Sequence, residues 1–233
     1  NKDKLTDVGR QLSELYPQSR IICCVVDITK EEDVKSATES IVSKLGKINV
    51  LINNAANNTA VTKNDSAGFT RLEEFPIEVW NRDIEVGLTG AFLMSKYIGR
   101  HMAASGGGVI LNIASDISVI APDQRIYRKP GLAPDQQPVK PVSYWIIKTG
   151  LIGLTRYLAT YWPDKGVRAN SLSPGGVYND QPDEFVVKLS GLITLKRMAG
   201  VDEYKAAVLF LCSDASSYMT GANLIIDGGR TCW

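Results

Sequence analysis

Histidine is nearly absent from this sequence, which has a single one, His101, among 233 residues. Histidine is the side chain that most often moves protons near neutral pH. His101 lies near the end of an expected helix, in IGRHMAASGGG, where a surface or capping role is the ordinary one. Acid–base chemistry in this chain is therefore expected to use tyrosine, lysine, aspartate or glutamate.

Cysteine and long apolar runs are scarce too. The four cysteines, Cys23, Cys24, Cys212 and Cys232, form no C-x-x-C pair and no disulfide-like framework, which favours a reducing compartment. No apolar run reaches the roughly 18 residues needed to span a membrane, and NKDKLTDVGR does not have the pattern of a signal peptide. We therefore predict a cytoplasmic protein with no membrane partner and no metal site.

The charge balance is close to neutral. A net charge of +1 gives no basic or acidic excess that would indicate nucleic acid or a strongly charged partner. With 44% hydrophobic and 22% charged residues, the composition is typical of a globular domain with a sizeable core.

Helical and strand-like patterns alternate along the chain. Apolar runs predict strands at 20–28, 48–56, 106–115, 166–176 and 223–229, and helical periodicity predicts helices at 3–16, 31–45, 76–104, 143–162 and 202–213. Strands that are apolar on both faces and separated by helices are typical of a parallel sheet covered on both sides. We therefore predict an α/β fold, a doubly wound three-layer α/β/α sandwich forming one domain over residues 1–233.

Polar or turn-forming residues close four of the apolar runs. Asp27, Asn53–Ala56, Ser115 and Pro174–Gly176 each stand at the end of an expected strand. Strand termination explains any one of them. Because parallel strands bring their carboxyl ends to one edge, where ligands bind in open α/β sheets, these residues are expected to line a shared cleft.

Tyr144 and Lys148 lie four residues apart at the head of an expected helix, in SYWIIKTG (143–150). This spacing places both side chains on one face, roughly 6 Å apart along the helix axis. A free phenol, with a pKa near ~10, is a poor base at neutral pH, whereas a neighbouring ammonium favours the phenolate. The pair is either a buried phenol beside a surface cation or a proton donor with the group that tunes it.

Taken in order, these segments resemble the classical short-chain dehydrogenase/reductase family. NNAA (53–56) is similar to the family's N-N-A-G turn, ILNIAS (110–115) and SYWIIKTG to its serine and Y-x-x-x-K pair, VRANSLSPGGV (167–177) to its P-G turn, and residues 207–229 to its C-terminal block. The resemblance covers essentially the whole chain. It implies a Rossmann-type fold and an NAD(P)-dependent oxidoreductase acting on a secondary alcohol or ketone. The alternative is a non-catalytic member that binds a nucleotide or a protein partner.

The resemblance assigns catalytic roles to three residues. It implies that Tyr144 exchanges a proton with the substrate oxygen, that Lys148 tunes the phenol and binds the nicotinamide ribose, and that Ser115 holds the substrate oxygen. The structural alternative for Ser115 is that it only ends a strand.

The resemblance also implies a site for NAD or NADP. On the adenosine side, Asp27 would hydrogen-bond the adenine, and Ile28 would offer backbone contacts. Asn53 and Ala55 would pass under the adenosine ribose.

On the nicotinamide side, Pro174 and Gly175 match the turn that faces the ring, although a tight turn alone would also explain them. Val177 would meet the carboxamide through its backbone. Asn179 stands where the family usually has a threonine that contacts the same group.

Two family features are missing from the sequence. The glycine-rich T-G-x-x-x-G-x-G loop, which binds the pyrophosphate, and the strands expected between 20–28 and 48–56 do not occur, so a native segment ahead of Asn1 is expected. Gly87, in EVGLTG, replaces an asparagine that helps a water chain carry protons. A mid-helix glycine costs up to about 1 kcal/mol relative to alanine, so Gly87 is expected to make room for water or for close packing.

A proline-rich insert at 116–143 separates Ser115 from Tyr144 by more than the family's usual spacing. It is either an ordered surface loop, an oligomer contact or a wall of the substrate pocket. In the last case Arg125, Arg128 and Lys129 would hold an anionic, sugar-derived substrate. The sequence around the insert resembles bacterial members associated with flagellin modification and acidic-sugar pathways.

Self-association is expected as well. The helices at 76–104 and 143–162 carry apolar residues around much of their circumference, and by resemblance they pair with symmetry mates. We predict a homodimer or homotetramer that acts on a small-molecule substrate and binds no nucleic acid.

Overall fold

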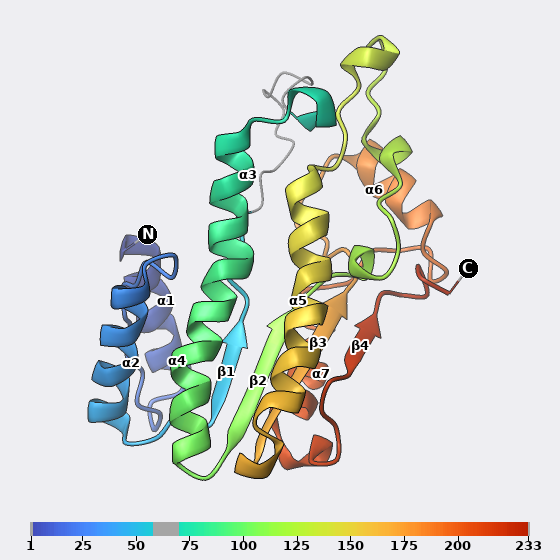
Figure 1. The fold of residues 1–233 in the computed structure, drawn as a ribbon. Helices are drawn as coiled ribbons and strands as arrows, with labels where there is room; N and C mark the ends of the chain where they lie inside the picture. Colours follow the sequence, from blue (N-terminus) through green and yellow to red (C-terminus); the bar gives the residue numbers. More distant parts are fainter. Residues whose placement is uncertain (1, 58–69, 233) are drawn as a thin grey trace.

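The computed structural model describes residues 2–57 and 70–232. Four parallel strands form one sheet in the order β1-β2-β3-β4. They are β1 (Val50–Asn53), β2 (Gly108–Ile113), β3 (Val167–Pro174) and β4 (Asn223–Ile226). All four carboxyl ends point the same way, upward in Figure 1, toward the insert and the loops above the sheet.

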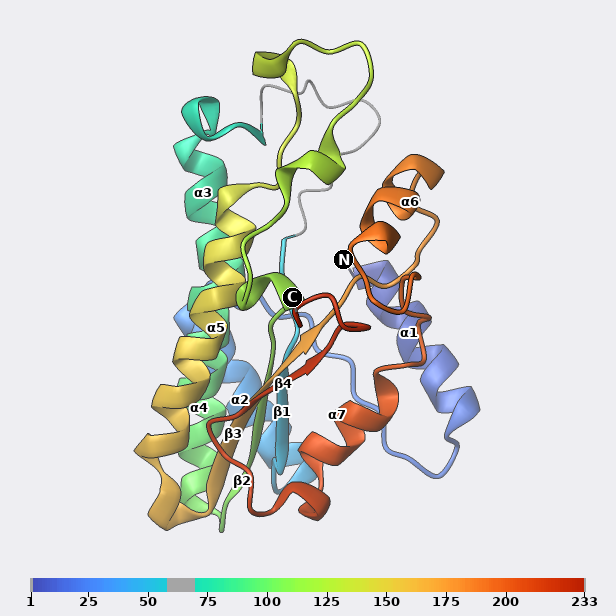
Figure 2. The same ribbon diagram turned by 90° about the vertical axis from the view of Figure 1, so that its right-hand side faces the viewer.

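Helices cover both faces of the sheet, as Figure 2 shows. One face carries α3 (Ile77–Ile84), α4 (Gly90–Ala104) and α5 (Val142–Tyr161), and the other carries α7 (Lys205–Cys212). The helix α1 (Lys2–Leu15) lies beyond the β1 edge of the sheet, as Figure 1 shows. The fold is therefore the predicted α/β class, with a parallel sheet between two helical layers.

Two further helices lie at the margins. The helix α2 (Glu31–Leu45) packs beside α4, where the Tyr97 hydroxyl donates a hydrogen bond to Glu31 over 2.8 Å. The helix α6 (Asp183–Gly191), which the sequence patterns did not predict, packs on the insert near η5, the 3₁₀ helix Gln124–Tyr127.

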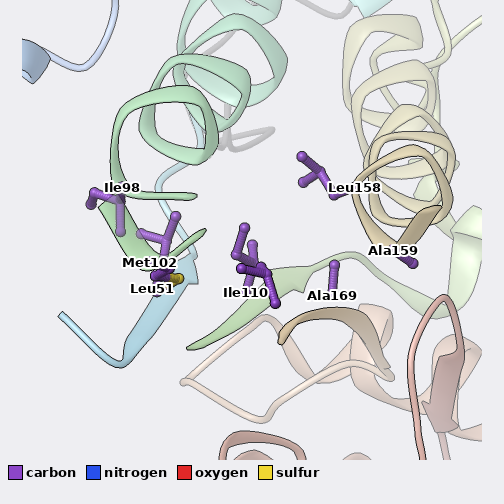
Figure 3. Packing of buried hydrophobic residues seen from close by; sticks show 8 residues of the cluster. Leu51, Ile98, Met102, Ile110, Leu158, Ala159 and Ala169 are labelled. Carbon is purple, nitrogen blue, oxygen red and sulfur yellow. The ribbon is translucent and has the colours of Figure 1, made fainter. Parts of the chain in front are cut away.

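The core follows the two-residue period of the strands. Ile110 of β2 packs with Ile98 and Met102 of α4, whereas the next residue, Leu111, packs with Leu211 of α7 on the opposite face. Figure 3 shows side chains of α4 and α5 meeting those of the sheet. Fully burying an aliphatic side chain of this size contributes about 1.5–3 kcal/mol, so both helical layers are held by the same strands.

The segment at 20–28 differs from its prediction as a buried strand. It forms no strand and pairs with none among the described residues, and Val25 is 69% exposed. β1 likewise has no second neighbour in the described part of the sheet. An apolar run needs hydrogen-bonding neighbours to become a strand, and residues 2–57 and 70–232 provide none for this one.

The long helix predicted at 76–104 is present but interrupted. Between α3 and α4, residues Glu85–Thr89 form one widened π-helical turn, with Gly87 buried at its centre. The other predicted helices and the remaining four strands agree with the structure to within a few residues at their ends.

Candidate active site

Ser115, Tyr144 and Lys148 come together at the carboxyl end of β2. Ser115 lies just past the end of that strand, and Tyr144 and Lys148 lie in the first two turns of α5. The Lys148 ammonium donates a hydrogen bond to the carbonyl of Ile113 over 2.7 Å, which ties α5 to the strand end. The side chain of Ser115 is a hydrogen-bonding partner of the Tyr144 phenol.

The electrostatics around Tyr144 differ from the expectation. Burial raises the pKa of Tyr144, Ser115 lowers it and the negative charge of Asp116 raises it, with a net shift upward. Lys148 lies 5.7 Å from the centre of the phenol ring and does not contribute to that shift. Burial lowers the pKa of Lys148 itself to about 8. The phenol is thus kept in its protonated form.

A second ammonium, Lys140 of the insert, lies over the face of Tyr144. Its Nζ is 3.6 Å from the ring centre, a cation–π distance. Burial lowers the pKa of Lys140 to about 8, while the negative charge of Asp116 opposes this shift and the charges of Lys148 and Arg230 add to it. Within the part of the chain that the structure describes, this ammonium makes no hydrogen bond or ion pair. In the sequence, only its positive charge pointed to Lys140, and the other cations of the insert carry the same charge.

An ion pair also adjoins the serine. Asp116 Oδ2 accepts a hydrogen bond from Arg230 Nη1 over 2.7 Å, and Asp116 Oδ1 accepts one from Ser115 Oγ over 2.9 Å. Both charged side chains are at least nine-tenths buried. No sequence pattern predicted this pair, because the two residues are 114 positions apart.

The role of Gly87 is close packing. A Cβ at this position would stand 2.6 Å from Cγ2 of Ile147, a side chain of α5 that is 3% exposed. Ile147 therefore fills the space that a larger residue at position 87 would need. Of the two purposes expected for this glycine, the structure favours close packing over room for water.

The nicotinamide side of the expected site is built from the turn after β3. Gly175 is needed because a Cβ there would lie 2.8 Å from the Cα of Asp227. Gln181 donates to the Val177 carbonyl and accepts from the Asn179 N–H, so it fixes this turn. The Val177 N–H has no partner in the described part of the chain. This N–H is a suitable donor to the oxygen of a carboxamide. Pro174, the last residue of β3, comes directly before the turn.

The adenosine side of the expected site is more exposed to solvent. Asp27 is exposed, and hydrogen bonds from Thr29 lower the pKa of its carboxyl. Ile28 packs against Gly90, where a Cβ would lie 2.7 Å from its Cδ1. Ala55 is exposed.

The side chain of Asn53 has a structural task. It donates hydrogen bonds to Asn112 and Ser95 inside the protein, at 2.8 and 3.1 Å. The Asn112 amide continues to Thr155 of α5 over 2.8 Å. These bonds join β1, β2, α4 and α5, so only the backbone of Asn53 is available to a nucleotide.

Among the described residues, none of the three insert cations predicted to bind substrate makes a ring contact or hydrogen bond with Tyr144. Arg125 is bound to Asp123 through three side-chain contacts and is exposed. Arg128 is exposed, and Lys129 is fixed only through its backbone, by Gln137.

Comparison with known proteins shows the family of this chain. Residues 1–127 match the family described as short chain dehydrogenase, and residues 136–231 match the one described as Enoyl-(Acyl carrier protein) reductase. An NAD-dependent glycerol dehydrogenase of Listeria innocua is 35% identical, over 99% of this chain and 81% of its own length. A trans-4-hydroxycyclohexanecarboxylate dehydrogenase of Sinomonas cyclohexanicum is 34% identical, over 98% and 81%.

A solved structure shares the fold. The gluconate 5-dehydrogenase of Burkholderia cenocepacia, crystallised with NADP and tartrate, has a TM-score of 0.81 and 26% identity, with 100% of this chain and 83% of the other covered. The chain therefore belongs to the short-chain dehydrogenase/reductase family. It is an oxidoreductase with a Rossmann-type fold, and the predicted family, fold and enzyme class are confirmed.

The described residues contain neither a candidate membrane span nor a candidate metal cluster. None of the helices is both long and apolar enough to cross a membrane. The same residues contain no group of three or more His, Cys, Asp or Glu side chains that could hold a metal ion.

Proposed function

We propose that this protein interconverts a secondary alcohol and a ketone with NAD or NADP, through Ser115, Tyr144 and Lys148. The proposal is carried by the convergence of these three residues at the carboxyl end of β2, where Lys148 is tied to the Ile113 carbonyl and Ser115 interacts with the phenol. Ligands of open α/β sheets bind at this edge. The chain acts as one catalytic domain.

The residues divide the chemistry among themselves. The bound nicotinamide nucleotide supplies or accepts the hydride. Tyr144 gives a proton to the ketone oxygen or takes one from the alcohol. The Ser115 hydroxyl, which donates to Asp116 in this structure, turns its single proton to the substrate oxygen when the substrate binds. Lys148 uses one of its three N–H donors on Ile113, which leaves two for the nucleotide's ribose.

The direction of the pH dependence follows from the phenol. Burial raises the Tyr144 pKa, so the side chain is protonated at neutral pH and ready to donate to a ketone. Oxidation of the alcohol needs the phenolate and therefore becomes faster as the pH rises toward the pKa of Tyr144.

The substrate is a small hydroxylated compound that carries a carboxylate. Lys140 supports this because its ammonium lies beside the reacting phenol and makes no ion pair or hydrogen bond among the described residues. A carboxylate would satisfy it through charge-assisted hydrogen bonds. Names of similar proteins agree in kind, since they include a hydroxycyclohexanecarboxylate dehydrogenase and a gluconate 5-dehydrogenase.

Assembly and compartment complete the proposal. Phe92 on α4 and Tyr157 and Tyr161 on α5 are between 48% and 61% exposed, which supports pairing of these helices in a homodimer or homotetramer. The four cysteines are free, which suits the cytoplasm.

A substrate panel tests the function. Glycerol, threitol, xylitol, gluconate, tartrate and 4-hydroxycyclohexanecarboxylate would each be mixed with the protein and with NAD⁺ or NADP⁺, and reduced nucleotide would be followed by its absorbance. We expect turnover with at least one hydroxy acid, and loss of that turnover in Tyr144→Phe with unchanged nucleotide affinity. A Tyr144→Phe variant within a few-fold of the parent would exclude the proposed role of the phenol.

A further inference from the structure

The C-terminal turn after β4 reaches the catalytic serine. The Asp227 carboxylate accepts hydrogen bonds from the N–H groups of Gly229 and Thr231, at 2.9 and 2.8 Å. Thr194 adds a bond to the Gly229 carbonyl over 2.8 Å. These bonds fold the chain back, so that Arg230 is 8% exposed and meets Asp116.

Asp116 has a partner for each carboxylate oxygen. Oδ2 accepts from Arg230, while Oδ1 accepts from the Ser115 hydroxyl and from the N–H of Ile117 over 2.7 Å. The residue is 3% exposed. Burying a carboxylate this deeply is costly unless it is paired and hydrogen-bonded, and Arg230 supplies the pairing charge.

The backbone of Ser115 is fixed independently of this pair. Its N–H donates to Ser118 Oγ over 3.0 Å, and its carbonyl accepts from the Ser118 N–H over 2.9 Å. The Ser115 side chain takes part in the same capping box with Ser118, and its hydroxyl donates to Asp116. The capping box and the bond to Asp116 together select one of the three staggered rotamers about the Cα–Cβ bond.

Anchoring the C-terminal turn does not require a buried charge pair. The bonds of Asp227 and Thr194 already hold the turn, and apolar residues commonly replace a buried ion pair without loss of stability. Arg230 even leaves its buried Nε–H without an acceptor among the described residues, which carries a cost of its own. The charge pair instead connects Arg230 of the turn, through Asp116, to the Ser115 hydroxyl.

We propose that Asp116 and Arg230 are positioning residues through which the C-terminal turn fixes the Ser115 side chain beside Tyr144. The inference rests on the catalytic roles proposed for Ser115 and Tyr144. A displacement of the serine oxygen by about 1 Å can slow an enzyme by about a hundred-fold. Removing either partner should therefore slow turnover while leaving the nucleotide site unchanged.

Four variants test this: Arg230→Met, Arg230→Lys, Asp116→Asn and the double variant Asp116→Leu/Arg230→Met. We expect Arg230→Met and Asp116→Asn to lower kcat by about ten- to a hundred-fold, with nucleotide affinity within two-fold of the parent. Arg230→Lys should recover most of the loss. The double variant, which leaves no unpaired charge, should melt near the parent temperature and still be slow. A double variant with the parent's kcat would overturn the proposal.

Two further measurements, a pH profile and a variant structure, distinguish positioning of Ser115 from simple anchoring of the C-terminal turn. Asp116→Asn removes a negative charge that opposes the phenolate, so the rise of kcat/KM for alcohol oxidation should move to lower pH. A crystal structure of Arg230→Met should show Ser115 in another rotamer, and an unchanged Ser115–Asp116 bond there would count against the proposal even without an active substrate. Absence of turnover in the parent enzyme would instead count against the proposed function.

Discussion

The two parts of the proposed site, a catalytic end around Ser115 and Lys148 and an adenosine end around Asp27, differ in how firmly the protein holds them. At the catalytic end Ser115, Asp116 and Lys148 are between 3% and 7% exposed, and each has at least one hydrogen bond to a neighbour. At the adenosine end, Asp27 is exposed and Val25 is 69% exposed on a segment that pairs with no described strand. The catalytic end is built into the core, and the adenosine end lies on the surface.

This difference separates chemistry from nucleotide binding. Proton transfer needs groups fixed to within a fraction of an ångström, which burial and hydrogen bonding provide. Contacts with an adenosine need less precision. Substitutions at the catalytic end should therefore change rate by orders of magnitude, and those at the adenosine end should change affinity modestly.

The largest contrast is expected between Lys148→Ala and Asp27→Ala. Lys148→Ala removes a cation next to the phenol and a donor to the ribose, so kcat/KM should fall by about 10²–10⁴-fold and the nucleotide Kd should rise. Asp27→Ala removes one exposed hydrogen-bonding group, so its Kd should rise by no more than about ten-fold with kcat unchanged. Steady-state kinetics and nucleotide titration measure both, and comparable losses of kcat in the two variants would remove the contrast.

Packing beneath the catalytic end can be tested at Gly87. The Gly87→Ala variant should lower the free energy of unfolding by about 1–3 kcal/mol, because its Cβ would overlap Ile147. The matched control is Gly153→Ala on α5, where a Cβ meets nothing within 4 Å, and which should gain up to about 1 kcal/mol. Urea unfolding measures both, and a Gly87→Ala variant as stable as the parent would contradict the packing role.

The insert is tested by Lys140→Met against Arg125→Gln. Lys140→Met should raise KM for carboxylate substrates by about ten-fold or more and leave KM for neutral polyols unchanged. Lys140 loses its charge as the pH rises through a pKa of about 8, so the parent's KM for carboxylates should rise above that pH. Arg125→Gln should have no such effect because Asp123 already holds that guanidinium. If Arg125→Gln raised the KM for carboxylates and Lys140→Met did not, the anion would bind at Arg125, as the sequence predicted.

The smallest effect is expected at Val25. Val25→Ser replaces an exposed side chain and should change the free energy of unfolding by less than about 0.5 kcal/mol. Leu111→Ala, at a side chain with no exposure, should cost about 2–5 kcal/mol. Thermal or urea unfolding compares them, and a large loss in Val25→Ser would show that the segment at 20–28 is buried in solution.

The sequence by itself determined the alternation of elements, the fold class and the spacing of the proposed catalytic pair Tyr144 and Lys148. Strand and helix periodicity follow from neighbouring residues, and the four-residue spacing of Tyr144 and Lys148 places both on one helix face wherever that helix lies. Tertiary structure decided the features that depend on residues far apart in the sequence. It left the segment at 20–28 without a strand partner, and it filled the space at Gly87 with Ile147.

The charges of the site were beyond the reach of sequence patterns for the same reason. Lys140 was one of several similar cations in the insert, and only the path of the chain brought it, rather than Arg125, to the Tyr144 ring. Arg230 meets Asp116 across 114 positions, a contact that no local period encodes. Burial, which raises the Tyr144 pKa and lowers that of Lys148, exists only once the core has closed around both groups.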